Sequence, residues 1–229
     1  MLHYSNMRSN FFLDAFHEYQ KVILKCKPMK GNKILSVVKF YYYKLKGKHL
    51  LVHPNTIISG IKNISTTGIL SIGIDYFGFI SKRDFTYLNI CGKLITKGVF
   101  SIGRGCRFDI GSDAICILNK NSYISPFTNF IIMHGISIGE DCAISWNCQF
   151  LDEDFHSIEY PNKKNSEEKK IVISDKVWIG CNVNVFKGTV IAKGCVIAAN
   201  SVVSGLFIEE NCLIAGNPAT VIKKNINWN

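Results

Sequence analysis

Long apolar runs are missing from this chain of 229 residues, and we expect no secretory leader. No run of about 18 uninterrupted apolar residues occurs, so the sequence offers no membrane-spanning helix. Its first ten residues, MLHYSNMRSN, lack the apolar core and the small-residue cleavage site of a signal peptide. We therefore expect a cytoplasmic protein.

Charge is scarce and unevenly spread. Asp, Glu, Lys and Arg make up 19% of the residues and hydrophobic residues 47%, which argues against disorder and allows a substantial core. Acidic residues are absent between Tyr19 and Ile74, where lysines crowd, although the chain as a whole carries a formal charge of +10. A solvated basic face explains this segment, and peripheral contact with anionic lipid headgroups is the alternative. We expect no nucleic-acid partner.

Cysteine pairs with the spacing of zinc or redox motifs are missing too. The nine cysteines include no CxxC pair, and their odd number fits a reducing compartment better than a disulfide framework. We predict no metal site. Five cysteines follow an apolar residue of the repeat described below by four positions, and we expect them to be buried for packing: Cys106, Cys142, Cys148, Cys195 and Cys212.

A six-residue repeat is the most informative feature that is present. Large aliphatic residues recur at Ile173, Ile179, Val185, Ile191, Ile197 and Val203. A helix has a period of 3.6 residues and a strand a period of 2, so neither alone gives six. Short strands interrupted by a turn at every repeat do, and three such sides close one coil of a parallel β-helix. The phase wanders between residues 72 and 128, where we expect imperfect coils.

Helical spacing replaces this repeat near the start of the chain. Apolar and aromatic residues predict helices over residues 10–27 and 33–46. The predicted fold is mainly β, with a helical appendage at residues 1–48, a β-helix at 49–224 and a short tail at 225–229. One extruded loop, residues 151–170, interrupts the coils.

This loop begins with LDEDFH and is longer than the roughly 12–15 residues usual for a structureless connection. His156 stands beside acidic residues, and a neighbouring carboxylate, such as that of Asp154, can fix an imidazole tautomer and raise its basicity. An imidazole pKa near ~6.5 suits a general base. His134, in IIMHGISIG, is the rival histidine, with a purely structural role as its alternative.

The segment VWIGCNVNVFKGTVIAKGCVIAANSVVSG, followed by LIAGNPATVIKK, resembles the hexapeptide-repeat acyltransferases. The maltose and galactoside O-acetyltransferase branch is the most similar, closely over residues 171–224 and more weakly over 118–156. The resemblance implies a left-handed β-helix that forms a homotrimer. In that family a histidine on the loop before the VWIG coil is the catalytic base, and His156 occupies this place.

The resemblance also implies a reaction, the transfer of an acetyl group from acetyl-CoA to a hydroxyl of a saccharide or surface-polysaccharide unit. The family's coenzyme-contacting positions fall on Cys181, Ala199, Ser204, Gly205 and Lys223. Its acceptor site falls near Ser125, Asn129 and His134. The family often has a basic residue where Gly205 and Thr220 stand, so the phosphate contacts here would either be fewer or come from other lysines.

Three further functions stay open at the level of sequence. The same fold supports N-acetyltransferases of amino sugar nucleotides. It also supports metal-dependent hydratases resembling the gamma-type carbonic anhydrases, but three zinc-binding histidines are needed. His49 and His53 lie beside the appendage, and the rest of the coil region holds only His134 and His156. A noncatalytic, polyanion-binding β-helix is the third, suggested by the N-terminal lysines.

Overall fold

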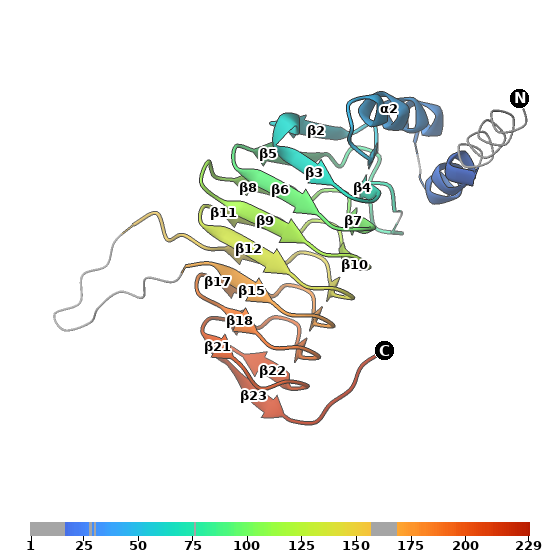
Figure 1. Ribbon diagram of the computed structural model, residues 1–229. Helices are drawn as coiled ribbons and strands as arrows, with labels where there is room; N and C mark the ends of the chain where they lie inside the picture. The colour runs from blue at the N-terminus through green and yellow to red at the C-terminus, as the bar shows by residue number, and fades with distance from the viewer. Residues whose placement is uncertain (1–16, 28, 30, 76, 157–168) are drawn as a thin grey trace, which may run out of the picture.

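From Leu50 to Gly216 the described residues form short strands that pass through three sheets in strict rotation, and one further strand, which ends at Lys223, turns back beside the last of them (Figure 1). The computed structural model describes residues 17–27, 29, 31–75, 77–156 and 169–229. Neighbouring strands in each sheet come from successive coils and run parallel, except for the antiparallel final pair. The predicted parallel β-helix is therefore confirmed.

The three sheets, here called A, B and C, divide the strands as follows. Sheet A holds β1 (Leu50–Val52), β4 (Leu70–Ile72), β7 (Phe100–Ile102), β10 (Ser122–Ile124), β13 (Ala143–Ile144), β16 (Trp178–Ile179), β19 (Val196–Ile197), β22 (Leu213–Gly216) and β23 (Ala219–Lys223). Sheet B holds β2 (Thr56–Ser59), β5 (Thr86–Ile90), β8 (Arg107–Ile110), β11 (Asn129–Ile132), β14 (Gln149–Leu151), β17 (Asn184–Phe186) and β20 (Val202–Val203). Sheet C holds β3 (Ile64–Thr66), β6 (Lys93–Thr96), β9 (Ile115–Leu118), β12 (Gly135–Ile138), β15 (Ile171–Ile173), β18 (Val190–Ile191) and β21 (Leu206–Phe207). A short 3-10 helix, η1 (Ile61–Asn63), joins β2 to β3.

The core is built from inward side chains that stack from coil to coil. Phe108, Phe130 and Phe150 are register partners on β8, β11 and β14, and all three are buried. Their rings lie face to face, with centroids 4.5 and 4.4 Å apart and planes within 14° and 8°. Each coil therefore covers the apolar surface that the previous coil would otherwise leave exposed to water.

Unequal coil lengths explain why the sequence repeat looks irregular. Val185 and Val203 are register partners 18 residues apart, which is three repeats of six. The Phe108 and Phe130 partners are 22 residues apart, and Phe130 and Phe150 are 20 apart. The additional residues lie at the corners, so strands form in all three sheets between Thr86 and Asn129 although the six-residue period is lost there.

Burial of the five repeat cysteines is confirmed. Cys106, Cys142, Cys148, Cys195 and Cys212 are all buried and none forms a disulfide. Burial raises the pKa of the Cys106 thiol to about 12 and that of Cys142 to about 11. Because these thiols stay neutral near pH 7, they act as small apolar side chains rather than nucleophiles.

Helical segments cover the first coil. Residues 17–26 are helical, and α2 (Lys33–Leu45) follows after Asn32, whose side chain accepts the Leu35 N–H at 3.0 Å. Both predicted helices are confirmed over the described residues, and residues 10–16 lie outside them. An ion pair between Glu18 and Lys44 joins the two segments. Their buried side chains Val22, Cys26 and Phe40, with Met29 between the two helices, form a second apolar cluster. Leu51 and Ile74 of the first coils complete it.

No helix among the described residues is long and apolar enough to cross a bilayer. The chain boundaries at residues 48 and 224 remain predictions. α2 ends at Leu45 and β1 begins at Leu50, so the helical and coiled parts meet within a few residues of the first boundary.

The stacked phenylalanines give a test of the core. Replacing Phe130 with Ala removes the middle ring of the stack and leaves a cavity, so the free energy of unfolding should fall by about 3–5 kcal/mol. Tyr123→Ala is the matched control, because the Tyr123 side chain is exposed on the neighbouring strand β10, and it should cost well under half as much. Guanidinium unfolding at equal protein concentration measures both. Equal losses would contradict the stacked core.

Candidate active site

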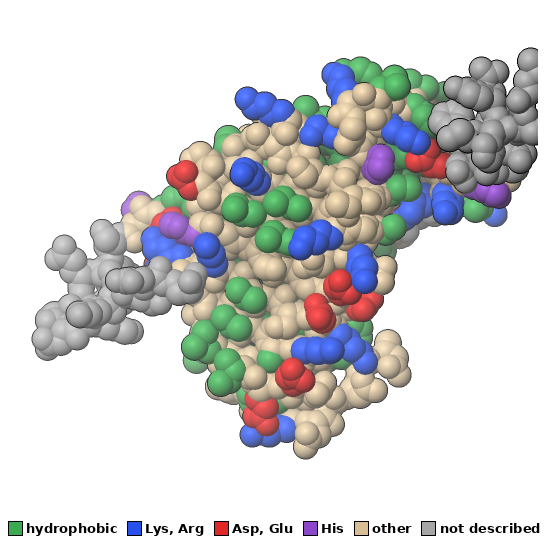
Figure 2. All heavy atoms as spheres, viewed as in Figure 1, with side chains coloured by type: hydrophobic (Ala, Val, Ile, Leu, Met, Phe, Trp, Pro, Cys, Tyr) green, Lys and Arg blue, Asp and Glu red, His purple; other side chains and the backbone are tan. Residues whose placement is uncertain are grey.

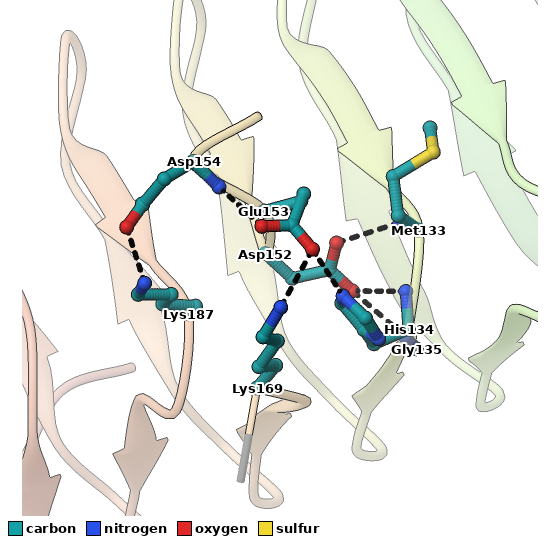
Figure 3. Close-up of polar contacts among 8 residues, drawn as sticks. All are labelled: Met133, His134, Gly135, Asp152, Glu153, Asp154, Lys169 and Lys187. Carbon is teal, nitrogen blue, oxygen red and sulfur yellow. Dashed lines mark hydrogen bonds and ion pairs between the residues drawn. The ribbon is translucent and has the colours of Figure 1, made fainter. Parts of the chain in front are cut away.

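A cluster of charged side chains lies at the corner where the chain passes from sheet B to sheet C (Figure 3). The turn after β11 carries Met133 and His134, and the segment after β14, one coil further on, begins with Asp152. The buried Asp152 carboxylate accepts the backbone N–H groups of Met133, His134 and Gly135 at 2.6, 2.9 and 2.7 Å. These three charge-assisted hydrogen bonds fix the conformation of the turn that carries His134.

The His134 ring is held by a carboxylate. Its Nε2 atom lies 2.7 Å from Oε2 of Glu153, and the same oxygen accepts a hydrogen bond from Nζ of Lys169 at 2.7 Å. The hydrogen bond from Lys169, and then that from His134, lower the pKa of Glu153 to about 2. Glu153 is therefore a carboxylate at neutral pH.

The charge on Glu153 determines the tautomer of His134. Because a carboxylate only accepts hydrogen bonds, the Nε2 atom of His134 carries the hydrogen in this contact. In the neutral ring, Nδ1 then has no hydrogen and can accept one from a bound hydroxyl. The half-buried ring thus presents one defined acceptor atom.

His156 lies close by in sequence but is not held in this way. It is exposed, and no described residue forms a hydrogen bond with its ring. The carboxylates expected to support it have other partners in the structure, since Asp152 binds backbone N–H groups, Glu153 binds His134 and Asp154 pairs with Lys187 on the next coil. Asp152 and Glu153 therefore both face the preceding coil, whereas Asp154 faces the next coil.

The acceptor-site residues inferred from the family are separated along sheet B. Asn129 begins β11, and the whole strand lies between it and the turn that carries His134. Asn129 lines an open groove of about 400 Å³ at the opposite corner, where sheet A passes to sheet B. Ser125 is buried just before that corner, where its N–H donates to Ile144. Only His134 lies in the charged cluster.

The coenzyme-contacting residues inferred from the family fall at three places. Cys181 and Ala199 lie at the corner between sheets A and B, on successive coils, while Ser204 and Gly205 lie at the corner between sheets B and C. Lys223 ends β23 in sheet A and is exposed. The strands β17 and β20 lie between the two corners, so these five residues do not form one cluster within a single chain.

Sequence reasoning did not find the contact between His134 and Glu153. The strand register contains a signal for this contact. Phe130 and Phe150 are register partners 20 residues apart, so residues 152–154 lie one coil beyond residues 132–134 at the same corner. Lys169 and Lys187 belong to later coils and complete the cluster, and their place in it was not predicted from the sequence. The side-chain pairing itself depends on corner geometry that the repeat does not specify.

The charged cluster gives a pH prediction. A carboxylate whose pKa is lower in the folded state stabilises that state above its unfolded pKa near ~4.3, and this contribution is lost as the pH falls towards about 2. Lys169→Met should raise the pKa of Glu153 clearly, and His134→Ala should raise it less. A ¹³C NMR titration of the Glu153 side-chain carboxyl measures this. A pKa still near the low wild-type value in Lys169→Met would contradict the assignment of the main cause.

Comparison with known proteins gives close relatives of this chain, although no family model matches it. An uncharacterized 24.8 kDa protein in the cps region of Klebsiella pneumoniae is 43% identical over 183 residues, which is 79% of this chain and 82% of that protein. The protein named "Putative lipopolysaccharide biosynthesis O-acetyl transferase WbbJ", from Escherichia coli K12, is 33% identical over 148 residues, 60% of this chain and 75% of that protein.

A solved structure supports the fold. It is a mutant of AntD, an N-acyltransferase from Bacillus cereus, in complex with dTDP and coenzyme A; it aligns with a TM-score of 0.50 over 86% of this chain and 90% of that chain, at 17% identity. The identity is too low to show more than the shared left-handed β-helix. The sequence relatives identify the chain as an acyltransferase that belongs to the hexapeptide-repeat family, alongside O-acetyltransferases.

Proposed function

We propose that this acyltransferase transfers an acetyl group from acetyl-CoA to a hydroxyl of a surface-polysaccharide unit. The observation that carries the proposal is the pair of relatives, one from a cps region and one named for O-acetyl transfer in lipopolysaccharide biosynthesis. Both are similar over three quarters or more of their own length. The coenzyme A complex of AntD supports a coenzyme A thioester as the donor.

His156 is the general base in this proposal. It removes the proton from the acceptor hydroxyl while that oxygen attacks the thioester carbonyl, the carbon–sulfur bond breaks and coenzyme A leaves as the thiol after protonation. Asp154 lies two residues before it and pairs with Lys187, which supports the start of the loop. His134 orients the acceptor through its Nδ1 atom, with Glu153 fixing the ring.

A homotrimer completes the site in this proposal. The face shown in Figure 2 carries hydrophobic side chains on the outer surface of sheet C, and Ile115, Val172 and Leu206 are exposed there. A second copy would bury this surface and bring its own corner residues beside the charged cluster. Coenzyme-contacting residues at different corners, Cys181 and Ala199 at one and Ser204 and Gly205 at the other, would then come from two chains.

The direct test is acetyl transfer itself. Purified protein is incubated with labelled acetyl-CoA and a panel of neutral, acidic and amino-bearing glycans, and the acceptors are analysed by mass spectrometry. The proposal predicts an acetyl ester on a hydroxyl, which mild alkali removes. Label confined to an alkali-stable amide would indicate N-acetyl transfer instead, and no labelled glycan would contradict the proposal.

The two histidines can be separated by substitution. His156→Ala should lower kcat by about 10²–10⁴, the effect of losing a general base, while coenzyme A binding and assembly stay intact. His134→Ala should mainly raise KM for the acceptor, since that ring orients the hydroxyl. Steady-state kinetics with calorimetric titration of coenzyme A distinguish these outcomes. Unchanged kcat in His156→Ala, together with a large loss in His134→Ala, would transfer the role of base to His134.

We also propose that the chain is cytoplasmic and binds the inner face of the membrane peripherally through α2. Five large side chains on one side of this helix are exposed: Ile34, Leu35, Val38, Tyr42 and Leu45. At 3.6 residues per turn they form one stripe, with Lys39 and Lys46 along one edge and Lys33 and Lys44 towards the other. An apolar stripe with lysine edges is the pattern of an interfacial helix.

The positive charge beside this apolar stripe favours contact with anionic lipid over contact with a second copy of the chain. The described chain from Tyr19 to Ile74 carries no carboxylate side chain, and the acid that reaches α2, Glu18, pairs with Lys44. Two copies of the stripe placed face to face would bring like charges together. Anionic headgroups supply the opposite charge, at roughly 1 kcal/mol per lysine near the surface.

Vesicle binding tests this surface. Ile34→Ser with Leu45→Ser should lower binding to phosphatidylglycerol-rich vesicles about tenfold or more, because two apolar side chains no longer enter the interface. The matched control is Ile208→Ser with Ile222→Ser, since these exposed side chains, at 78% and 55% against 78% and 89% for Ile34 and Leu45, lie outside the sheet C surface. Co-sedimentation at low and high salt measures binding. Equal losses in both pairs, or no preference over phosphatidylcholine, would contradict the proposal.

A further inference from the structure

The open groove at the corner between sheets A and B, away from the charged cluster, has a chemical character of its own. Its volume is about 400 Å³. Four successive coils line it, together with the end of the long connection between β4 and β5. The lining residues used below are Arg83, Tyr87, Gly105, Arg107, Phe127 and Asn129.

Strand register arranges the floor of the groove. Tyr87, Arg107 and Asn129 are register partners on β5, β8 and β11, so they stand in one row on the outer face of sheet B. Neighbouring strands lie about 4.8 Å apart, and the row therefore spans roughly 10 Å. This length and the mixture of a ring, a guanidinium and an amide suit one or two sugar rings better than a compact ion.

Arg107 is positioned without being neutralised. Its guanidinium carbon lies 4.9 Å from the centroid of the Tyr87 ring, and the side chain is exposed. Among the described residues, no acceptor forms a hydrogen bond with this guanidinium. A planar guanidinium steadied by an aromatic ring presents paired N–H donors that match a carboxylate.

One carboxylate, that of Asp84, lines the groove, and it accepts a hydrogen bond from another residue. Oδ2 of Asp84 accepts the N–H of Ser81 at 2.7 Å within its own loop. Two arginines, Arg83 and Arg107, and one aspartate line the groove, so its net charge is positive. No acid of the lining binds Arg107. A ligand with one negative charge would balance this surplus.

Phe127 lines the groove and belongs to a small cluster of aromatic rings. Phe127 lies directly over Gly105, where an added Cβ would come within 2.4 Å of the ring, so the glycine allows this close approach. Phe79 stands beside Phe127 with ring centroids 6.0 Å apart and beside Trp146 at 5.8 Å, and both Phe79 and Trp146 are exposed. Exposed ring faces can pack against the C–H face of a pyranose ring.

We propose that this groove binds an acidic saccharide, with the carboxylate of a sugar on Arg107, its ring against Phe127 and its hydroxyls on the Asn129 amide. This inference rests on the proposed saccharide acceptor and specifies its class. The groove holds a part of the acceptor chain remote from the hydroxyl that is acetylated, because the whole of β11 separates Asn129 from the turn of His134.

Calorimetric titration of the full-length protein tests the groove without depending on catalysis. The probes are a hexasaccharide of alternating glucuronic acid and N-acetylglucosamine, a trimer of sialic acid, and the carboxyl-reduced form of each. At least one acidic probe should bind about tenfold or more tightly than its reduced form. Arg107→Gln should weaken that binding about 10- to 100-fold, the effect of losing a charge-assisted pair.

Lys193→Gln is the matched control, because it removes the same charge from an exposed position in the turn between β18 and β19. It should leave binding within about twofold, and Tyr87→Leu should weaken binding less than Arg107→Gln. Equal losses in Arg107→Gln and Lys193→Gln would indicate a general charge effect and overturn the proposal. Equal binding of acidic and reduced probes, or full displacement by inorganic phosphate, would overturn it as well.

Failure of the groove and failure of the proposed function give different results. If the protein acetylates a neutral glycan but binds neither acidic probe, the groove proposal is wrong and the acetyltransferase proposal stands. If an acidic probe binds through Arg107 but no glycan receives an acetyl ester, the groove is a saccharide site and the proposed reaction is wrong.

Discussion

Stacking of inward side chains from coil to coil is the constraint on which the rest of the structure depends. The row that contains Phe108, Phe130 and Phe150 continues to Val185 and Val203, and all five side chains are buried. A slip of one residue in any strand would turn its core side chain towards water. Additional residues are therefore accommodated only at the corners, where they leave the register of the strands intact.

Residues inserted at the corners of the coils form the two candidate sites of this protein. The insertion after β14 delivers Asp152 and Glu153 to the turn of the preceding coil, where they fix the backbone and ring of His134. The long connection between β4 and β5 brings Arg83 to the opposite corner, beside Arg107. Sheet B thus has a charged histidine cluster at one edge and an aromatic, basic groove at the other.

The repeat makes the fold predictable from sequence, whereas the site depends on geometry that the repeat does not specify. Ile173 to Val203 keep a strict six-residue period because the last coils have no added corner residues, and those coils could be assigned before any coordinates were known. The coils of Phe108 and Phe130 are two to four residues longer, which hides the same period. His156 could be chosen from its place in the family motif, but the pairing of Glu153 with His134 follows from side-chain directions at one corner.

We propose that the reacting thioester lies at the corner between sheets B and C, where both histidines stand. A crystal structure of the protein with coenzyme A tests this most directly. The account predicts the coenzyme thiol beside the charged cluster, within hydrogen-bonding reach of His156 from the same chain or from a neighbouring copy. A thiol at the corner between sheets A and B, beyond the reach of both histidines, would contradict the account.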